Sequence, residues 1–329
     1  MKIAVVILNW NGKKLLEKFL PSVLEFSKEA DLYIADNAST DDSIWFITSH
    51  YPSIKIIHNE TNGGYAKGYN DALKHIEADI FCLLNSDVEV TQKWLLPIID
   101  IFKNQPNTAI VQPKILDYKR KDYFEYAGAG GGFIDKFGYP YCRGRIFNTL
   151  EKDLGQYDDI ADIFWASGAC FFVRSDIYKR FEGFDETFFA HMEEIDFCWR
   201  VKNTGLDIKY VGHSRVYHLG GATLSKSNPK KTFLNFRNSL YTLTKNARGP
   251  LFQIVLGRLM LDGVAAIKFL LELKPLHTFA ILKAHFHYYW HLTKLLKQRK
   301  SQNSKIKYFN KISVIVRYFI MKKRIYKIL

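Results

Sequence analysis

The 329-residue sequence contains only four cysteines, and no two of them have the spacing of a metal site or a redox motif. They stand at positions 82, 142, 170 and 198, each among apolar neighbours. A secreted disulfide framework is therefore not expected. We predict four reduced thiols within a core, as is usual in a reducing compartment.

Long apolar runs are also missing. A spanning helix needs about 18 uncharged apolar residues in succession, and the nearest approach, residues 251–271, is interrupted by Arg258, Asp262 and Lys268. The apolar run at residues 3–9 is too short for an export signal and indicates a strand instead. These absences favour a cytoplasmic protein without a membrane span.

Acidic residues are scarce in the last quarter of the chain. Residues 246–329 contain 17 Lys and Arg but only Asp262 and Glu272 as acids, a net charge of +15 when the whole chain carries +14. The rest of the chain is therefore close to neutral. The excess positive charge is therefore confined to one segment. Nucleic-acid-binding proteins usually have a basic domain of a recognised fold, so this charge distribution argues against nucleic-acid binding.

This basic segment has wide apolar faces. Residues 256–274 and 277–300 place Lys and Arg between apolar and aromatic side chains, a pattern typical of helices that lie on an anionic membrane. The alternative is that these helices pack on the body of the protein or on a partner subunit. The expected location is thus cytoplasmic and peripheral on the inner face of the cell membrane.

The first third of the chain alternates between apolar runs and helical spacing. The predicted strands are 3–9, 31–37, 53–59 and 79–87, and helical segments follow the first three. Such alternation predicts an α/β fold with a doubly wound, mostly parallel sheet. The pattern changes near residue 115 and becomes helical after about 232. We therefore predict a ligand-binding half (1–115), a second half (116–245) and a basic helical tail (246–329).

Two carboxylates follow the fourth predicted strand. Asp87 and Glu89 are two residues apart, so in an extended segment both side chains point the same way. No basic residue stands beside them in the sequence. Oxygen ligands of this kind suit Mg²⁺ or Mn²⁺, which commonly bridge to substrate phosphates. The alternative is a solvated turn with two unrelated acids.

The other strand ends carry polar or glycine-rich segments. Asp36 ends the second strand, where a carboxylate can bind a ribose or cap the next helix. Residues 62–70 follow the third strand, and there Gly64 allows close backbone approach while Lys67 could meet a phosphate. The G-x-G-x-x-G fingerprint of dinucleotide binding is absent.

An ordered set of segments resembles the family 2 glycosyltransferases of the GT-A type. The segments are VVILNWNG (5–12), ADNASTDDS (35–43), NGGYAKGYN (62–70), LLNSDVEV (83–90), FWASGACFFVRS (164–175), FDETFFAHMEEIDFCWR (184–200) and YHLGGAT (217–223). The resemblance covers about residues 1–245 and is nearest to the bacterial rhamnosyltransferase-like enzymes of surface polysaccharide assembly. It implies a GT-A fold with an acceptor-side subdomain and C-terminal amphipathic helices.

The resemblance also implies roles for individual residues. The D-x-D element of the family falls on Asp87 and Glu89, and His218 matches a histidine that joins the metal in some relatives. The catalytic acid pair falls on Glu193 and Glu194, with Asp196 after it; we favour Glu194 as the base, although most relatives have Asp there. The positions implied to bind the nucleotide sugar are Leu8, Trp10, Asp36, Asn37, Gly64, Lys67, Asn70, Asn85, Ser86, Asp87 and Trp165.

Several of these residues have simpler explanations. Glu193 and Glu194 would stabilise the positive end of a helix whether or not they act in catalysis. Asp196 could pair with its i+4 neighbour Arg200. His218 could be a hydrogen-bonded structural residue, and Trp165 could belong to the core.

The predicted function is inverting transfer of a sugar from a nucleoside-diphosphate sugar, such as dTDP-rhamnose or a UDP-sugar, to a hydroxyl of a glycan or lipid-linked acceptor. Mg²⁺ or Mn²⁺ is the expected cofactor. A nucleotidyltransferase of related fold is one alternative, but those enzymes usually have a glycine-rich basic loop after the first strand, and LNWNGKK (8–14) has one glycine. A non-catalytic sugar- or membrane-binding protein is the other, and the intact carboxylates speak against it.

Overall fold

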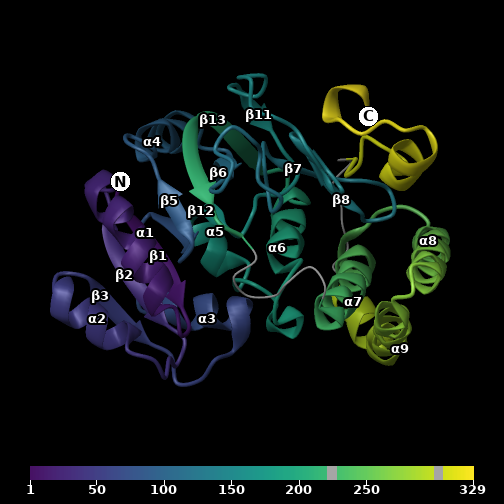
Figure 1. The fold of residues 1–329 in the computed structure, drawn as a ribbon, viewed down its shortest axis with the longest axis horizontal. Coiled ribbons are helices and arrows are strands. Elements are labelled where there is room, and N and C mark those ends of the chain that lie inside the picture. Colours follow the sequence, from purple (N-terminus) through teal and green to yellow (C-terminus); the bar gives the residue numbers. More distant parts are fainter. Residues whose placement is uncertain (221–227, 300–306) are drawn as a thin grey trace.

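A sheet of nine strands forms the centre of the protein (Figure 1). The computed structural model describes residues 1–220, 228–299 and 307–329. The strands of this sheet are β1 (Ile3–Asn9), β2 (Asp31–Asp36), β3 (Lys55–His58), β4 (Ile80–Asn85), β5 (Val88–Val90), β6 (Thr108–Asp117), β11 (Ile160–Asp162), β12 (Cys170–Arg174) and β13 (Asp207–His218). Their order is β11-β13-β6-β12-β4-β1-β2-β3, and β5 pairs with the end of β13.

Six of these strands end at the same edge of the sheet. β3, β2, β1 and β4 pair in parallel, and β6 pairs in parallel with β13. β12 lies antiparallel to both β4 and β6, so β6 and β13 run in the same direction as β1. The carboxyl ends of β1, β2, β3, β4, β6 and β13 therefore meet where ligands bind in open α/β sheets.

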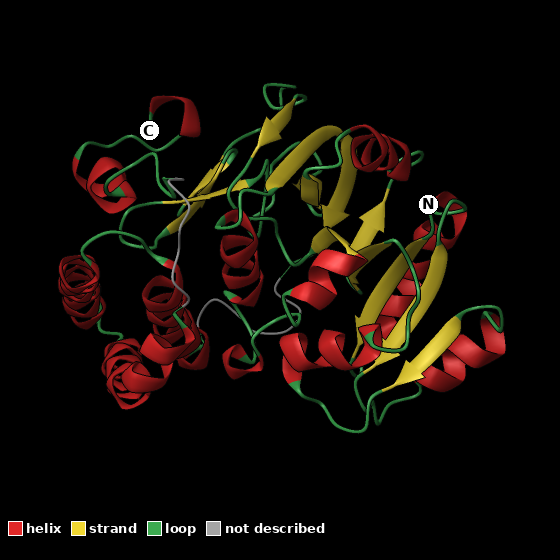
Figure 2. Ribbon diagram, turned by 180° about the vertical axis from the view of Figure 1, so that it is seen from behind, coloured by secondary structure: helices red, strands yellow, loops and turns green. Residues whose placement is uncertain are grey.

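Helices cover both faces of the sheet (Figure 2). One face carries α1 (Lys13–Phe26), α2 (Ser43–His50) and α4 (Leu95–Asn104), and the other carries α3 (Gly64–Leu73), α5 (Ser175–Arg180) and α6 (Glu193–Lys202). The residues of β1 explain this division, because Val5 packs with the first group and Val6 with the second. A strand that is apolar at every position can be buried on both sides.

A second, smaller sheet lies beside the C-terminal segment (Figure 1). It contains four antiparallel strands, β7 (Gly132–Ile134), β8 (Pro140–Cys142), β9 (Arg145–Ile146) and β10 (Thr149–Leu150). The short helical turns η2 (Val316–Ile320) and η3 (Tyr326–Ile328) lie at the chain end. Val314 and Leu329 form a buried cluster with Tyr141 and Ile146. The last described residues are therefore held against this sheet.

Three long helices form a layer at the side of the molecule away from β3 (Figure 1). They are α7 (Pro229–Asn246), α8 (Leu251–Leu271) and α9 (Pro275–Gln298), and α7 packs along α9. α8 is joined to the body through the fully buried Asp262, which accepts hydrogen bonds from Arg258 Nε (2.7 Å) and Tyr139 Oη (2.6 Å). One side of the basic tail therefore packs on the protein.

The predicted segment boundaries fall inside these elements. The boundary after residue 115 lies within β6, whose sheet contains strands from both predicted halves. The boundary after residue 245 lies in the last turn of α7. The halves thus share one sheet, because β6, β12 and β13 extend the surface that β1–β4 begin.

The predicted α/β architecture is confirmed. β1 to β4 each lie within the predicted strand ranges, and the mostly parallel sheet and C-terminal helices are present. All four cysteines are buried and unpaired, as expected. Among the described residues no helix is both long and apolar enough to cross a bilayer. Residues 221–223 of the YHLGGAT segment and residues 300–306 of the tail lie outside the described residues.

Candidate active site

A buried histidine lies between two carboxylates at the carboxyl edge of the sheet. β5 pairs with the end of β13 so that His218 lies opposite Val88. This pairing places His218 Nε2 3.1 Å from Asp87 Oδ1, and His218 Nδ1 lies 3.3 Å from Glu125 Oε2. All three side chains are buried. Sequence analysis predicted Asp87 and His218 but missed Glu125.

The charges in this cluster stabilise one another. Burial alone would lower the pKa of His218, but Glu125 and Asp87 raise it to about 10. Burial opposes ionisation of Asp87, yet His218 holds the pKa of this carboxyl below its ordinary value. Asp87 is thus an anion with a cationic partner, which the residues beside it in the sequence do not supply.

Glu89 has a different partner. Its Oε1 atom lies 2.5 Å from Lys121 Nζ, and its side chain is about one-third exposed. Within the described part of the chain no three His, Cys, Asp or Glu side chains are grouped as metal ligands. Although no basic residue stands beside these carboxylates in the sequence, the fold brings His218 to Asp87 and Lys121 to Glu89 from distant segments.

The Asp87–His218 pair fits a divalent cation once His218 loses its Nε2 proton, because an imidazole binds a metal in its neutral form. Neighbouring ligands of an octahedral ion with bonds of about 2.1 Å stand about 3 Å apart, close to the separation of Asp87 Oδ1 and His218 Nε2. A carboxylate on the second ring nitrogen, as Glu125 provides, is the usual support of a metal-binding histidine. The donor set present is one carboxylate and one imidazole, to which water and substrate oxygens could be added.

Glu193 and Glu194 begin α6 after a strained segment. Phe189, His191 and Met192 have φ angles of 64°, 69° and 74°, in the left-handed region that side chains other than glycine rarely adopt. Burial raises the pKa of Glu194 to about 7, although backbone N–H groups at the helix start oppose this. Such a carboxylate is suited to accept a proton near neutral pH.

The two glutamates differ in exposure. Glu193 is buried, and burial together with the charge of Glu194 raises its pKa well above the ordinary value. Glu194 is partly exposed. The Oε2 atoms of both side chains are buried and accept no hydrogen bond. Buried carboxylate oxygens without partners are costly to the fold, which makes a functional role more plausible than a structural one.

Helix α7 holds the strained segment in place. The Asn238 side chain is fully buried, and its Nδ2 donates to the carbonyl oxygens of Phe188 (3.1 Å), Ala190 (2.9 Å) and His191 (2.7 Å). On the other side, Tyr65 N–H donates to the Phe189 carbonyl at 3.1 Å. Neither contact was predicted, because each joins segments that are far apart in the sequence.

Asp196 lies between α6 and α7. It is fully buried, and it accepts hydrogen bonds from Arg200 Nε (2.9 Å), Lys245 Nζ (3.1 Å) and Asn246 Nδ2 (2.7 Å). Asp196 therefore attaches α6 to the end of α7. The pairing with Arg200 that was the simpler explanation is present, and these bonds account for the burial of Asp196, while a catalytic role for it stays a prediction.

The predicted nucleotide-binding residues of the first strands lie at the same edge. Asp36 is buried and accepts a hydrogen bond from Asn9 Nδ2 at 3.3 Å, while Trp10 is 54% exposed at the end of β1. Asn37 Nδ2 donates to Asn62 Oδ1 at 2.8 Å, which fixes the loop after β3. Leu8 lies beneath this loop, in contact range of Gly68. Only Trp10 presents a large free surface.

The loop after β3 combines a glycine turn with an internal ion pair. Gly64 has a φ of +79°, and a Cβ atom there would lie 2.5 Å from the Phe189 carbonyl oxygen. Glycine is therefore required where α3 meets the segment before Glu193. Lys67 is not free, because its Nζ lies 2.5 Å from Asp71 Oδ2 in the next turn of α3.

Two predicted binding residues have structural roles. Asn70 Nδ2 donates to the Phe184 carbonyl (2.8 Å), and its Oδ1 accepts from Tyr178 Oη (2.7 Å) and Phe184 N (2.9 Å). A further bond to Glu186 uses its remaining donor, so no group is left for a ligand. Trp165 is buried, and its Nε1 donates to the Phe133 carbonyl at 2.8 Å. Sequence alone cannot show that distant partners occupy these side chains.

Asn85 and Ser86 flank the Asp87 turn. Asn85 Nδ2 lies 3.5 Å from His218 Nε2, so it borders the buried cluster. Ser86 is partly exposed and lies near Gly12 in the loop after β1. Both are placed at the edge where Asp87 and Trp10 also lie.

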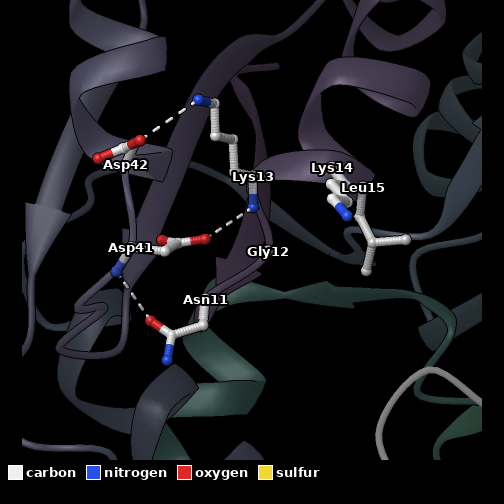
Figure 3. A pocket seen from close by; sticks show the side chains of 7 residues that line it. All are labelled: Asn11, Gly12, Lys13, Lys14, Leu15, Asp41 and Asp42. Carbon is white, nitrogen blue, oxygen red and sulfur yellow. Dashed lines mark hydrogen bonds and ion pairs between the residues drawn. The ribbon is translucent and has the colours of Figure 1, made fainter.

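A separate pocket of about 370 Å³ lies at the start of α1 (Figure 3). It is lined by Asn11, Gly12, Lys13, Lys14, Leu15, Asp41 and Asp42, none of which was predicted as a site residue. Asn11 Oδ1 accepts from Asp41 N at 3.3 Å, and Asp41 Oδ2 accepts from Lys13 N at 3.1 Å. These polar groups form hydrogen bonds with each other, and the bonds fix the loop that carries Trp10.

Solved structures place this architecture among the GT-A glycosyltransferases. The chain is similar to TarS 1-349 of S. aureus in complex with UDP-GlcNAc, with a TM-score of 0.57, 16% identity and coverage of 95% of this chain and 100% of that chain. It is also similar to GalNAc-T7 with UDP, GalNAc and Mn²⁺, with a TM-score of 0.58, 15% identity and coverage of 74% of this chain and 48% of that chain. At these identities the likeness establishes the fold.

The chain belongs to glycosyl transferase family 2, because residues 4–181, more than half of its length, match the model of that family. Among curated proteins it is 24% identical to the N-acetylglucosaminyl-diphospho-decaprenol L-rhamnosyltransferase of Mycobacterium tuberculosis, over 66% of this chain and 75% of the relative. It is 21% identical to the rhamnosyltransferase WbbL of Escherichia coli, over 66% of this chain and 83% of the relative. The family resemblance inferred from the sequence is confirmed.

Proposed function

We propose that this protein is an inverting glycosyltransferase that moves a sugar from a nucleoside-diphosphate sugar to a hydroxyl of a glycan or lipid-linked acceptor in bacterial surface polysaccharide assembly. dTDP-rhamnose is the first donor to consider, since relatives are named rhamnosyltransferases, and a UDP-sugar is the second, since TarS binds UDP-GlcNAc. The observation that carries the proposal is the Asp87–His218–Glu125 cluster at the carboxyl edge of the sheet, together with the loop after β3, which contacts the segment before Glu194 at Phe189.

In the proposed mechanism Glu194 takes the proton of the acceptor hydroxyl as its oxygen attacks the anomeric carbon. The nucleoside diphosphate leaves from the opposite face, so the configuration at that carbon inverts. General base catalysis of this kind contributes typically about 10²–10⁴-fold to the rate. Trp10 and Asp36 would hold the nucleotide, with Trp10 offering an exposed ring surface to the base.

Asp87 and His218 are the proposed holders of Mg²⁺ or Mn²⁺, with Glu125 orienting the imidazole ring. A divalent cation bound there would neutralise the negative charge that develops on the leaving diphosphate. Mn²⁺ is present in the GalNAc-T7 structure, which supports this choice of cofactor. Glu89 would act through Lys121 or through water unless its ion pair with Lys121 opens.

The proposed location is the cytoplasmic face of the cell membrane. The basic segment 246–329 would attract an anionic surface, and a relative acts on a decaprenol-linked substrate according to its name. A lipid-linked acceptor would then be presented to the site where it is anchored.

A donor panel tests this function. We expect Mn²⁺-dependent release of free nucleoside diphosphate from one donor among dTDP-, UDP- and GDP-sugars, with NMR of the product showing inverted configuration. Release from no donor, in the presence of Mg²⁺ or Mn²⁺ and of glycan and lipid-diphosphate acceptors, would remove the transferase assignment. Retained configuration would remove the single-displacement mechanism.

A further inference from the structure

The outer side of α8 and α9 has an apolar surface that no described element covers. We call it the α8–α9 face and define it by Phe252, Leu256 and Met260 on α8 and by Phe279, Phe286 and Trp290 on α9. Each of these six side chains is at least 46% exposed, and Phe252 and Trp290 reach 79% and 78%. Several large apolar side chains gathered at this exposure usually mark a site of interaction.

The exposed apolar residues recur at helical spacing on both helices. Phe252, Leu256 and Met260 are four residues apart, and Phe279, Phe286 and Trp290 are separated by seven and four residues, so each set forms one stripe along its helix. α8 and α9 pack against each other. Figures 1 and 2 show both helices at the side of the molecule, with the sheet and its covering helices lying to their other side.

The charges around the face point to a negatively charged occupant. The two acids of the segment are both neutralised: Asp262 is buried with Arg258, and Glu272 lies 2.9 Å from Lys274. Residues 251–298, which form the two helices, contain six Lys and Arg against these two acids, a net charge of +4. A second copy of this chain would bring the same positive charge to the contact, so like charges would oppose a symmetric dimer there.

We propose that the α8–α9 face is a membrane-docking surface that lies in the headgroup region of an anionic bilayer, with both helices in the plane of the membrane. Trp290 and the neighbouring Tyr289, which is 55% exposed, are the side-chain types that prefer this region. Neither helix can cross a bilayer, which fits an in-plane arrangement.

The docking surface is connected to the candidate base through two layers of packed structure. α9 packs on α7, and Asn238 of α7 binds the carbonyl groups of the segment that precedes Glu193 and Glu194. This step rests on the proposed transfer function. A lipid diphosphate carries its sugar at the membrane surface, and the arrangement places the base on the side of the protein that faces this surface. The docking itself does not depend on catalysis.

Vesicle flotation of the full chain, without sugar donor, tests the proposal. We expect binding to vesicles of phosphatidylcholine with phosphatidylglycerol, weaker binding at 0.5 M NaCl, and little binding to phosphatidylcholine alone. The double variant Phe286→Ser with Trp290→Ser should bind at least about tenfold more weakly, because two exposed aromatic anchors are lost. The matched control is Trp45→Ser with Leu154→Ser, which removes two side chains of similar exposure far from this face and should float like the wild type.

Equal flotation of the Phe286→Ser/Trp290→Ser variant and the wild type would overturn the proposal, as would equal binding to neutral and anionic vesicles. A lipid-free dimer in light scattering that this variant dissociates would assign the face to a second copy instead. Release of nucleoside diphosphate, measured without vesicles, reports on the proposed function separately, so failure of docking and failure of transfer give different results.

Discussion

At the scale of single residues, Glu194 is the group on which the proposed chemistry depends. We expect Glu194→Gln to lower transfer by about 10²–10⁴-fold while donor binding stays within a few fold, because the amide cannot accept the proton. Isothermal titration with the donor and a transfer assay would measure the two effects. Glu193→Gln is the matched control and should retain most activity, since Glu193 is buried. The opposite ranking would make Glu193 the base.

The raised pKa of Glu194 predicts a pH dependence. The base acts only when ionised, so kcat/KM should rise as the pH passes through about 7 and level off above it. Stability should change in the opposite sense. The folded-state pKa lies above that of the unfolded chain, so the native state loses stability between about pH 4.5 and pH 7, by up to about 3 kcal/mol. Glu194→Gln should reduce this loss, while the part due to Glu193, whose pKa is also raised, remains; urea titrations at pH 5 and pH 8 would measure the difference.

Glu125 has a predicted supporting role that differs from that of Glu89. Glu125→Gln removes the carboxylate behind His218, so Mn²⁺ affinity should fall about 10–100-fold in a calorimetric titration. Glu89→Gln should have a smaller effect, because Lys121 already holds that carboxylate. A larger loss from Glu89→Gln than from Glu125→Gln would make Glu89 a direct ligand.

At the scale of elements, the strands that carry the site residues could be predicted from the sequence. The contacts between side chains of different strands and loops could not. β1 to β4 follow from apolar runs that end in polar residues, and those ends carry Trp10, Asp36 and Asp87. Glu125 and Lys121 could not be predicted, because β13 brings His218 and Glu89 to them only by pairing with both β5 and β6. The partners of Asn70 and Trp165 could not be predicted for the same reason, since distant backbone groups bind their polar atoms.

Helix α7 should control the segment that carries the base. Asn238→Ala removes the side-chain donor of the Ala190 and His191 carbonyl oxygens, whereas the Phe188 oxygen keeps Arg237 Nη2 and Ala190 N. The loss should cost about 2–3 kcal/mol of folding free energy and lower kcat more than it raises KM. Asn228→Ala, which removes only the cap at the start of the same helix, is the control and should cost about 1 kcal/mol without changing kcat. Equal kcat values for the two variants would show that Asn238 has no positioning role.

At the scale of the whole molecule, the C-terminal quarter is both a part of the fold and a surface element. The sequence indicated its charge and its amphipathic helices, but it left open whether they pack on the protein or bind a membrane. The structure shows that the inner side packs: α9 lies along α7, and Asp262 binds Tyr139 of the loop between β7 and β8. The outer side stays exposed, so the two alternatives apply to different faces of the same helices.

This arrangement predicts that the 1–245 truncation does not keep the native stability. It removes Asn246, whose amide donates to the buried Asp196, and it removes α9, which covers the side of α7 that carries Tyr241 and Thr244. The truncation therefore exposes one side of α7 to solvent and removes one hydrogen-bond donor from the buried Asp196 carboxylate. We expect the melting temperature to fall by well over 5 °C, or the chain to aggregate. Circular dichroism melts of the truncated and full chains would measure this. The control is a full chain with Phe252→Ser and Phe279→Ser, which changes only the outer face and should melt like the wild type. An unchanged melting temperature in the truncation would mean that residues 246–329 form a dispensable appendage.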